Sequence, residues 1–507
     1  MSSLRVLPNL RSAWLRSERG LDRCFSEAAN PLNHLGAIAG LLLAVLLLSG
    51  TYLYAIFDTS VGGAYASIND LRQQPLVGGW IRSIHRYAAD AFVVVSLLHL
   101  LRELLIGHFR GYRRITWLTG IPLLGLMYIS GIGGFWLNWD RLGQYAAVVS
   151  AELIDALPLV NATLTRNFIA AEALNDRLFS LLIFIHLGVP LLLLFGLWFH
   201  LQRVSRPRVW PPRTIALGVL LPLAVVALLL PVYSQSPAQL DSAPTALAFD
   251  WAVLHPLALA RLVSPQVFWA VVVVLTAILA ALTAWPQRQQ PVAKVDADNC
   301  NGCRRCVDDC PYSALSFQAH PNAKPGMQIV AVAADRCASC GICAGSCPSA
   351  TPFRSGQSLI NGIDMPAAPV GQLRSALREG LAQRAQGSTT VVFGCAEGAR
   401  LESLDRPEVL SFALPCAAAL PPSFVEYALS EGARHVVVSG CVGAACAYRL
   451  GSDWTKQRLA GERPPRLRAS VPAEKVQWVA ANRGQEARLL RALGRSIDTI
   501  PATEPCA

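Results

Sequence analysis

The sequence predicts an all-α membrane bundle of six transmembrane helices, followed by a cytoplasmic α+β domain and a small α/β domain. Two observations lead to this fold class. The chain is 53% hydrophobic and only 15% charged, whereas soluble domains usually carry about 25% charged residues. Of its 14 cysteines, only Cys24 precedes residue 300. The apolar region and the cysteine-rich region are therefore separate parts of the chain.

Six apolar stretches are long enough to cross the core of a bilayer, which takes about 20 helical residues. They cover residues 35–57, 80–106, 115–137, 178–200, 214–233 and 266–285. The first stretch is too long for a secretory signal, follows a polar segment and lacks a small-residue cleavage site. We therefore expect it to remain as a helix.

Arginines gather in the N-terminal tail and in the second-to-third and fourth-to-fifth connections, and they are sparse in the other connections. By the positive-inside rule, both termini are predicted to be cytoplasmic. The net charge of +11 follows from this bias and does not indicate nucleic-acid binding, because no aromatic residues alternate with the basic ones. The expected parts are a cytoplasmic tail (1–33), a membrane domain (34–285), a linker (286–294) and two soluble domains (295–355 and 356–507).

Two histidine pairs with the same spacing stand in two of the predicted spans. His85 and His99 are fourteen residues apart, and so are His186 and His200. Fourteen residues make about 3.9 helical turns, or about 21 Å, so each pair lies on one helix face with one histidine near each membrane surface. A lone intramembrane histidine is often a packed interhelical donor, but packing does not require the same spacing twice. Adjacent helices with these pairs would hold two six-coordinate b haems, which carry electrons and bind no substrate.

Glycines repeat the same spacing on the two other spans of this group. Gly36 and Gly50 lie on the first span, and Gly120 and Gly134 lie on the third. Glycine lets a neighbouring backbone approach a flat ring closely. The four spans are therefore predicted to form a dihaem four-helix core.

Residues 30–285 resemble the cytochrome b of quinol:cytochrome c oxidoreductases. The resemblance is carried by the four histidines, the four glycines, Arg82, Trp117, Pro190 and the segment GFWLNW at 134–139. It implies that His85 and His186 hold the haem near the outer surface, and that His99 and His200 hold the haem near the cytoplasm. It also implies that Arg82 pairs with a haem propionate; the alternative is an arginine that snorkels to the interface.

The same resemblance suggests where quinone binds. The family lines its outer quinol site with a Pro-Glu-Trp-Tyr motif, and the equivalent place here contains Asp250 and Trp251. These are the candidate catalytic residues, with Asp250 as the proton-handling carboxylate; an interfacial tryptophan beside a solvated aspartate is the alternative. The family's inner quinone site uses a histidine and an acidic residue after the fourth span, and residues 201–222 contain neither. We therefore expect the cytoplasmic-side haem to exchange electrons with another partner.

Two C-x2-C-x2-C-x3-C-P runs, at 300–311 and 337–348, have the pattern of a bacterial two-cluster ferredoxin. In this pattern three thiolates of one run bind one cubane and the fourth binds the other cluster. Structural zinc, the alternative, prefers paired C-x2-C knuckles. The expected ligands are Cys300, Cys303, Cys306 and Cys347 for one [4Fe-4S] cluster, and Cys337, Cys340, Cys343 and Cys310 for the other.

The last part of the chain shows a βαβ-like pattern, with strands predicted over 389–395 and 435–441 and a helix over 421–431. Cysteines stand at two strand ends, where such folds place chemistry. Cys395, Cys416, Cys441 and Cys446 suit one [2Fe-2S] cluster. Buried inert cysteines are the alternative, and Cys24 and Cys506 have no assignment.

This part resembles the delta, iron–sulfur subunit of the methyl-viologen-reducing hydrogenase family. The match lies in the Pro-Cys of 415–416 and in residues 440–459; it departs at Cys395, which no second nearby cysteine follows. The resemblance implies electron transfer with a flavoprotein of the heterodisulfide-reductase type.

Together these features predict a membrane-bound electron-transfer subunit of the bacterial inner membrane, the quinone-reactive part of an oxidoreductase complex. It would connect a cytoplasmic flavin or heterodisulfide-reductase-like oxidoreductase to the quinone pool. The expected cofactors are two haem b, two [4Fe-4S] clusters and one [2Fe-2S] cluster, with quinone as substrate and membrane lipid around the bundle. The rival function is a redox-sensing membrane anchor that recruits a cytoplasmic enzyme without quinone turnover. Assembly as a homodimer and the direction of electron flow stay open.

Overall fold

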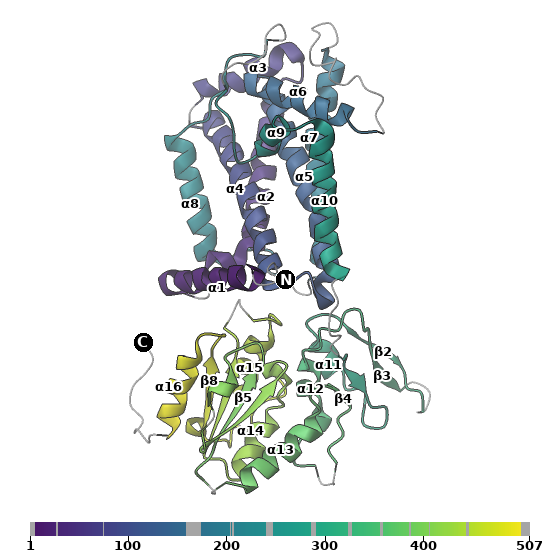
Figure 1. Ribbon diagram of the computed structural model, residues 1–507, viewed down its shortest axis with the longest axis vertical. Helices are drawn as coiled ribbons and strands as arrows, with labels where there is room; N and C mark the ends of the chain where they lie inside the picture. Colours follow the sequence, from purple (N-terminus) through teal and green to yellow (C-terminus); the bar gives the residue numbers. More distant parts are fainter. Residues whose placement is uncertain are drawn as a thin grey trace. The chain divides into compact units, whose positions relative to one another are not determined.

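The computed structural model divides into two compact units, Met1–Gln287 and Arg288–Ala507 (Figure 1). It describes residues 6–26, 29–74, 76–158, 174–202, 204, 207–239, 247–284, 291–322, 327–354, 358–384, 387–404, 406–442 and 446–497. The division falls in the expected linker, of which residues 286–290 lie outside the described residues, as does Cys506.

The described part of the first unit is built from helices. Their bounds are α1 Val6–Phe25, α2 Leu35–Ile56, α3 Val61–Asp70, α4 Gly78–Ile106, α5 Arg114–Asn138, α6 Arg141–Asp155, α7 Asp176–Gln202, α8 Arg213–Leu229, α9 His255–Ala260 and α10 Pro265–Ala281. Helices α2, α4, α5, α7, α8 and α10 occupy the six predicted spans. In Figure 1 these long helices run side by side, with α3, α6 and α9 at one end of the bundle.

Four helical segments of the described chain are long and apolar enough to cross a bilayer: Pro31–Ile56, Gly111–Asn138, Phe179–Gln202 and Pro265–Ala284. Helix α8 is apolar but has only 17 residues. Helix α4 has 29 residues, but its mean hydropathy is lowered by charged side chains that include Arg82, Arg86 and Asp90. The count of six spans therefore stays a prediction.

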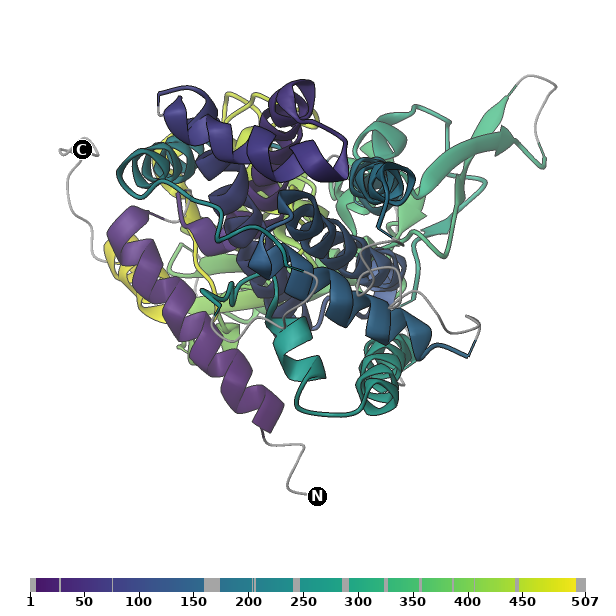
Figure 2. The same ribbon diagram turned by 90° about the horizontal axis from the view of Figure 1, so that it is seen from above.

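The histidine-bearing helices each pack along a glycine-bearing helix. Helix α2 packs along α4, and α5 packs along α7. Seen from above, α8 and α10 lie on opposite flanks of these four helices (Figure 2). At one end of the core, the ring of Trp139 meets that of Phe179 edge-on, with centroids 5.7 Å apart. The two helix pairs place each predicted haem ligand beside a helix that carries glycines at the same spacing.

The segment predicted as an N-terminal tail contains helix α1, which lies across the bundle axis in both views (Figures 1 and 2). Arg102 Nε of α4 donates to Glu18 Oε1 at 2.8 Å. Asn30 Nδ2 donates to Glu18 O at 2.9 Å, and Asn30 is buried. These contacts tie α1 to the end of α4 that carries His99.

The second unit combines small antiparallel pairs with one parallel sheet. Its elements are β1 Lys294–Val295, α11 Arg305–Asp308, β2 Leu315–Ala319, β3 Gln328–Val332, α12 Ile342–Ser346, β4 Ile363–Asp364, α13 Val370–Ala382, β5 Thr390–Cys395, β6 Val409–Leu414, α14 Ser423–Ser430, β7 His435–Gly440, α15 Gly451–Leu459, β8 Val476–Ala480 and α16 Glu486–Ile497. Strand β1 pairs with β4, and β2 pairs with β3. The parallel sheet has the order β6-β5-β7-β8.

The predicted βαβ pattern corresponds to β5, α14 and β7. Sequence reasoning missed β6 and β8. Strand β5 is buried along its whole length, so its apolar run is continuous, whereas β6 and β8 are partly exposed and mix polar with apolar residues. An α/β region therefore forms the C-terminal part of the chain, with a larger sheet than the pattern indicated.

Candidate cofactor sites

Each predicted haem-ligand histidine faces a glycine of the neighbouring helix. If each glycine carried a Cβ atom, its distance to the imidazole Cε1 would be 3.4 Å for Gly36 and His99, 3.1 Å for Gly50 and His85, 3.3 Å for Gly120 and His200, and 3.0 Å for Gly134 and His186. Any larger side chain would extend into the space of the ring. The four glycines therefore leave room for the imidazoles themselves.

The helix that carries the glycines also contacts the Nδ1 atoms of three of these rings. Nδ1 lies 2.9 Å from Ser49 Oγ in His85, 3.1 Å from Thr119 Oγ1 in His200 and 3.0 Å from Ser130 O in His186. A carbonyl oxygen only accepts, so His186 Nδ1 carries the hydrogen and Nε2 keeps its lone pair. Metal-binding histidines commonly have this arrangement. Ser49 and Thr119 each directly precede a glycine, a signal that sequence reasoning missed.

The histidines of the two helix pairs meet at two levels. His85 interacts electrostatically with His186, and His99 interacts with His200. His99 Nδ1 also lies 3.9 Å from Glu103 Oε1. His85 with His186, and His99 with His200, are the two pairs predicted to hold haems. The donor set at each level, two imidazoles from different helices, fits bis-histidine ligation of a b haem.

Arg82, the predicted propionate partner, is 8% exposed. Its Nη2 donates to Ser234 Oγ at 2.7 Å and to Asn138 Oδ1 at 3.0 Å, and its Nη1 donates to Ile68 O at 3.3 Å. All three acceptors are neutral, although Asp140 lies within electrostatic range. The guanidinium lies one helical turn from His85 and is held inside the bundle, so it does not snorkel to solvent.

The two candidate quinone-site residues have different surroundings. Asp250 is 8% exposed, and its Oδ1 accepts a hydrogen bond from Val253 N at 2.8 Å. Trp251 is 70% exposed and meets the ring of Phe249 with centroids 5.0 Å apart. Asp250 is therefore buried and not a solvated loop residue, whereas Trp251 faces outward.

Arg86, which sequence reasoning missed, connects Asp250 to the level of His85. Its guanidinium contacts the carboxylates of Asp250 and Asp90. It also lies over the ring of Phe135, 4.6 Å from the centroid. Because one arginine faces two carboxylates, this cluster carries one more negative than positive charge when both are ionised. Such a group can take up a proton, which is what quinone chemistry requires.

At the level of His99, the end of α4 and the residues after it supply polar groups, whereas sequence reasoning looked for such groups only after the fourth span and found none there. Glu103 contacts His108, and Arg102 Nη1 lies 3.3 Å from Glu103 Oε1. Arg113 Nη1 lies 2.6 Å from His108 Nδ1. A histidine and an acidic residue thus lie beside the predicted cytoplasmic-side haem, but Glu103 lies at the end of the second span and His108 just after it, and neither comes after the fourth span.

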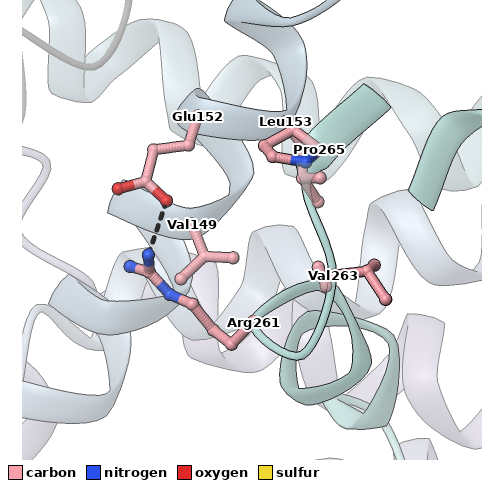
Figure 3. Close-up of a pocket in the computed structure, with 7 residues that line it drawn as sticks. Val149, Glu152, Leu153, Arg261, Val263 and Pro265 are labelled. Carbon is pink, nitrogen blue, oxygen red and sulfur yellow. Dashed lines mark ion pairs between the residues drawn. The ribbon is translucent and has the colours of Figure 1, made fainter. Parts of the chain in front are cut away.

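A small pocket lies between α6, the end of α9 and the start of α10 (Figure 3). Its lining includes Val149, Leu153 and Val263 and an ion pair in which Arg261 Nη1 is 2.8 Å from Glu152 Oε2. Its volume of about 110 Å³ is smaller than the roughly 300–1,000 Å³ of ordinary ligand pockets. It contains none of the predicted site residues.

The two ferredoxin-like cysteine loops share one backbone pattern. In the first loop Gly302 and Arg304 have φ of +65° and +75°, and in the second Ser339 and Gly341 have φ of +56° and +75°. These residues occupy the second and fourth positions after the first cysteine in each loop. Residues in left-handed conformations next to right-handed ones turn successive N–H groups toward one side, which makes a concave anion-binding site. Both loops therefore fit anionic iron–sulfur clusters.

The thiols of these loops gather in the two predicted groups. Burial and the charges of Cys347, Cys303 and Cys300 raise the pKa of Cys306 to about 12. Burial and the charges of Cys310 and Cys337 raise the pKa of Cys340 to about 12. The last cysteine of each run thus lies with the first three of the other run. Crowded thiols resist ionisation unless a cation joins them, and the iron of a cluster would supply that charge.

Three of the four cysteines predicted for the sheet domain lie at the carboxyl ends of parallel strands. Cys395 ends β5, Cys416 follows β6, and Cys441 follows β7. Cys441 Sγ is 3.6 Å from Cys395 Sγ, and Ser452 Oγ donates to Cys446 Sγ at 3.7 Å. Hydrogen bonds from Cys416 and Cys441 lower the pKa of Cys395 to about 3. Because sequence reasoning did not predict β6, it gave no structural reason for Cys416 to join this group. The structure shows that Cys416 lies at the end of a third strand.

The thiol of Cys416 is closely surrounded by the neighbouring helix. A Cβ added to Gly451 would collide with Cys416 Sγ, so the start of α15 lies directly against that thiol. In the described part of the chain, no three His, Cys, Asp or Glu side chains converge closely enough for a single metal ion. Haems and iron–sulfur clusters need wider spacing, because their ligands bind opposite sides of one iron or different irons.

Comparison with known proteins matches these regions separately. Residues 21–206 match the family model of cytochrome b/b6/petB, 299–351 match the 4Fe-4S dicluster domain, and 391–501 match the delta subunit of methyl-viologen-reducing hydrogenase. Cytochrome b6 of Synechococcus sp. strain JA-3-3Ab is 29% identical over 182 residues, which are 35% of this chain and 83% of the relative. Cytochrome b6 of Synechococcus elongatus is 28% identical over 179 residues, which are 34% of this chain and 83% of the relative.

Among solved structures, a hyperthermophilic respiratory complex III matches with a TM-score of 0.40 and 18% identity, over 49% of this chain and 74% of that chain. The family matches define a class of protein, a membrane electron-transfer protein that joins cytochrome b to iron–sulfur domains. This chain carries a cytochrome b/b6 domain, which implies haem b, a dicluster domain, which implies [4Fe-4S] clusters, and a domain like the hydrogenase delta subunit. Residues 207–285, with Asp250, lie outside the cytochrome b match.

Proposed function

We propose that this protein conducts electrons between a cytoplasmic oxidoreductase and the quinone pool. The observation that carries the proposal is that the predicted ligands of this chain lie close together in groups, each of which has the donor atoms of one cofactor. Two imidazole pairs lie in the bundle, two thiol groups lie in the ferredoxin-like loops, and a third thiol group lies at the edge of the parallel sheet. Bis-histidine haems and cysteine-ligated clusters transfer electrons without binding substrate at the iron.

The proposed ligands are the predicted ones. His85 and His186 would hold one haem b, and His99 and His200 the other. The two [4Fe-4S] clusters and the [2Fe-2S] cluster would be held by the three cysteine groups described above. Each of these cofactors, when bound, would store one electron and pass it on. The chain's own residues would fix the ligands and exclude water.

The site of quinone chemistry in this proposal lies beside the His85 level. Asp250 is buried there, contacts Arg86, and caps the following turn through Val253 N. A quinone gains or loses protons with its electrons, so its site needs a carboxylate or similar group within hydrogen-bond reach. Asp250, with Asp90 sharing the same arginine, would hold and release that proton.

The test uses membranes that contain the full chain. The haems are reduced with a cytoplasmic-side electron donor, and a soluble quinone analogue is then added while the haem absorption is followed. Rapid reoxidation of both haems supports electron transfer to quinone. Reduced haems that stay inert to the analogue would overturn the proposal and favour a redox-sensing anchor. A variant with both His85 and His186 replaced by Ala is the control, because it lacks the haem nearest Asp250.

A further inference from the structure

Arg458 on α15 is the largest fully buried side chain of the described residues, with 0% exposure. Arginine is almost never fully buried unless it is paired. Burying a charge is expensive when its partners are incomplete. A buried guanidinium in a domain of electron carriers therefore calls for an explanation beyond packing.

The guanidinium joins three loops that carry cysteines of three different predicted clusters. Arg458 Nη1 donates to Ala418 O at 2.9 Å, and Nη2 donates to Asp309 Oδ2 at 2.6 Å and also to Ser346 Oγ. Ala418 follows Cys416 by two residues, whereas Asp309 and Ser346 directly precede Cys310 and Cys347. One residue thus hydrogen-bonds a neighbour of one predicted ligand of each cluster.

The charges around Arg458 do not cancel. The second oxygen of Asp309 contacts Arg463, whose guanidinium lies 4.0 Å from the centroid of the Trp454 ring. Two arginines therefore share one carboxylate and leave one positive charge. Cys416 lies within electrostatic range of Arg458. Among the described residues Arg458 Nε has no hydrogen-bond partner, and the sulfurs of a cluster are acceptors.

The same region links two predicted clusters. Cys340 of the ferredoxin-like part and Cys416 of the sheet domain belong to one packed group with Ile342, Ala418 and Trp454. The distance between these two clusters is therefore set by the packing that Arg458 holds in place.

We propose that Arg458 is a positioning residue for electron transfer that raises the reduction potential of the cluster bound by Cys416. This inference rests on the proposed function. Each reduction adds one electron to the cluster, and a nearby fixed cation stabilises the added negative charge. The interaction is strong because the surroundings have a low dielectric constant. Cluster potentials depend on net charge and on hydrogen bonds to the sulfurs.

The test is a redox titration of the full-length protein, followed by electron paramagnetic resonance, with dithionite as reductant. Arg458→Met should make the potential of the [2Fe-2S] signal more negative, by about tenfold in the one-electron equilibrium or about 59 mV. Arg458→Lys keeps the charge and should shift it less. Asp309→Asn removes the opposing charge and should shift it in the positive direction. The haem potentials should not move.

Lys456→Met is the matched control, because Lys456 lies on the same helix but is exposed. It should leave every potential unchanged. If Arg458→Met fails to assemble the cluster, the sign of the shift in Asp309→Asn decides. Unchanged potentials in cluster-loaded Arg458→Met and Asp309→Asn would overturn the inference alone, whereas a wild-type protein without the [2Fe-2S] signal would overturn that part of the proposed function.

Discussion

At the scale of single residues, each predicted haem-ligand histidine faces a glycine, which has no side chain, on the neighbouring helix. A Cβ on Gly134 would lie 3.0 Å from His186 Cε1. His186 Nδ1 is at the same time 3.0 Å from Ser130 O. The ring is therefore held at Nδ1 and at Cε1, and the Nε2 lone pair is the one that a metal could use.

The first prediction concerns the pairing of histidines. His99→Ala and His200→Ala should each remove only the proposed cytoplasmic-side haem, because each would remove one of its two proposed axial ligands. Low-temperature absorption spectra of the reduced protein would show loss of one of two haem signals. His255→Ala is the control, since its ring packs against Tyr128 and belongs to neither pair. Two intact haems in both ligand variants would show that the pairing is wrong.

The second prediction concerns Asp250. Asn at this position can still accept the hydrogen bond from Val253 N but cannot exchange a proton or neutralise Arg86. Asp250→Asn should keep both haems and all clusters and slow quinone-dependent electron transfer by about 100-fold, the scale of a lost general acid–base. Turnover would be measured with a quinone analogue in membranes.

Asp250→Glu is the matched variant for this prediction, because it keeps the charge and adds the length found in the family motif. It should retain much more activity than Asp250→Asn. Wild-type turnover in haem-loaded Asp250→Asn would move the quinone site to the other level, where Glu103 and His108 lie near His99.

At the scale of elements, two helix pairs make the proposed haem-binding core. Helix α4 packs along α2, and α7 packs along α5, so that ligand and glycine always come from different helices. Fourteen residues bring a helix back to nearly the same face. The histidines of one helix and the glycines of its partner are both fourteen residues apart. The two histidine–glycine contacts of each helix pair are therefore in register along the bundle.

The third prediction compares two glycines of α5. A Cβ on Gly120 would lie 3.3 Å from His200 Cε1, whereas a Cβ on Gly125 would meet nothing within 4 Å. Gly120→Val should displace the imidazole and deplete the cytoplasmic-side haem, while Gly125→Val should keep both haems. Haem content per chain, measured by the pyridine haemochrome method, tests both variants. Equal haem content in the two would mean that Gly120 does not make room for the ligand.

At the scale of the whole molecule, the chain combines a helical unit with a cysteine-rich unit. Within the second unit, the loops of the ferredoxin-like part pack on the sheet domain through Gly345, whose added Cβ would meet the backbone of Ala418 and Ala419. Arg458 spans the same junction. The two iron–sulfur parts therefore form one compact body.

The fourth prediction is the iron content of the purified full chain. The proposed cofactors contain about twelve irons per chain, with two in the haems, eight in the cubanes and two in the remaining cluster. Acid-labile sulfide should approach about ten per chain, since only the clusters contain it. Iron and sulfide would be measured with zinc as the comparison metal. A content near ten irons with zinc present would mean that the sheet domain binds zinc.

The sequence alone was sufficient to predict the features that depend on short repeats along the chain. The histidine and glycine spacings, the two cysteine runs and the strand-like runs at β5 and β7 are periodic, and periodicity follows from backbone geometry that is the same in every protein. The three domain types could therefore be predicted, and the family matches bear them out.

Only the tertiary structure decided which side chains meet across the fold. It brought Arg86 to Asp250, Arg458 to Asp309, and Cys416 to the end of a third strand that the pattern did not indicate. It also placed Asp250 in the interior while leaving Trp251 exposed. These contacts join residues far apart in the chain, with Arg458 and Asp309 separated by 149 positions. No local pattern encodes such pairs, because their proximity depends on how whole elements pack.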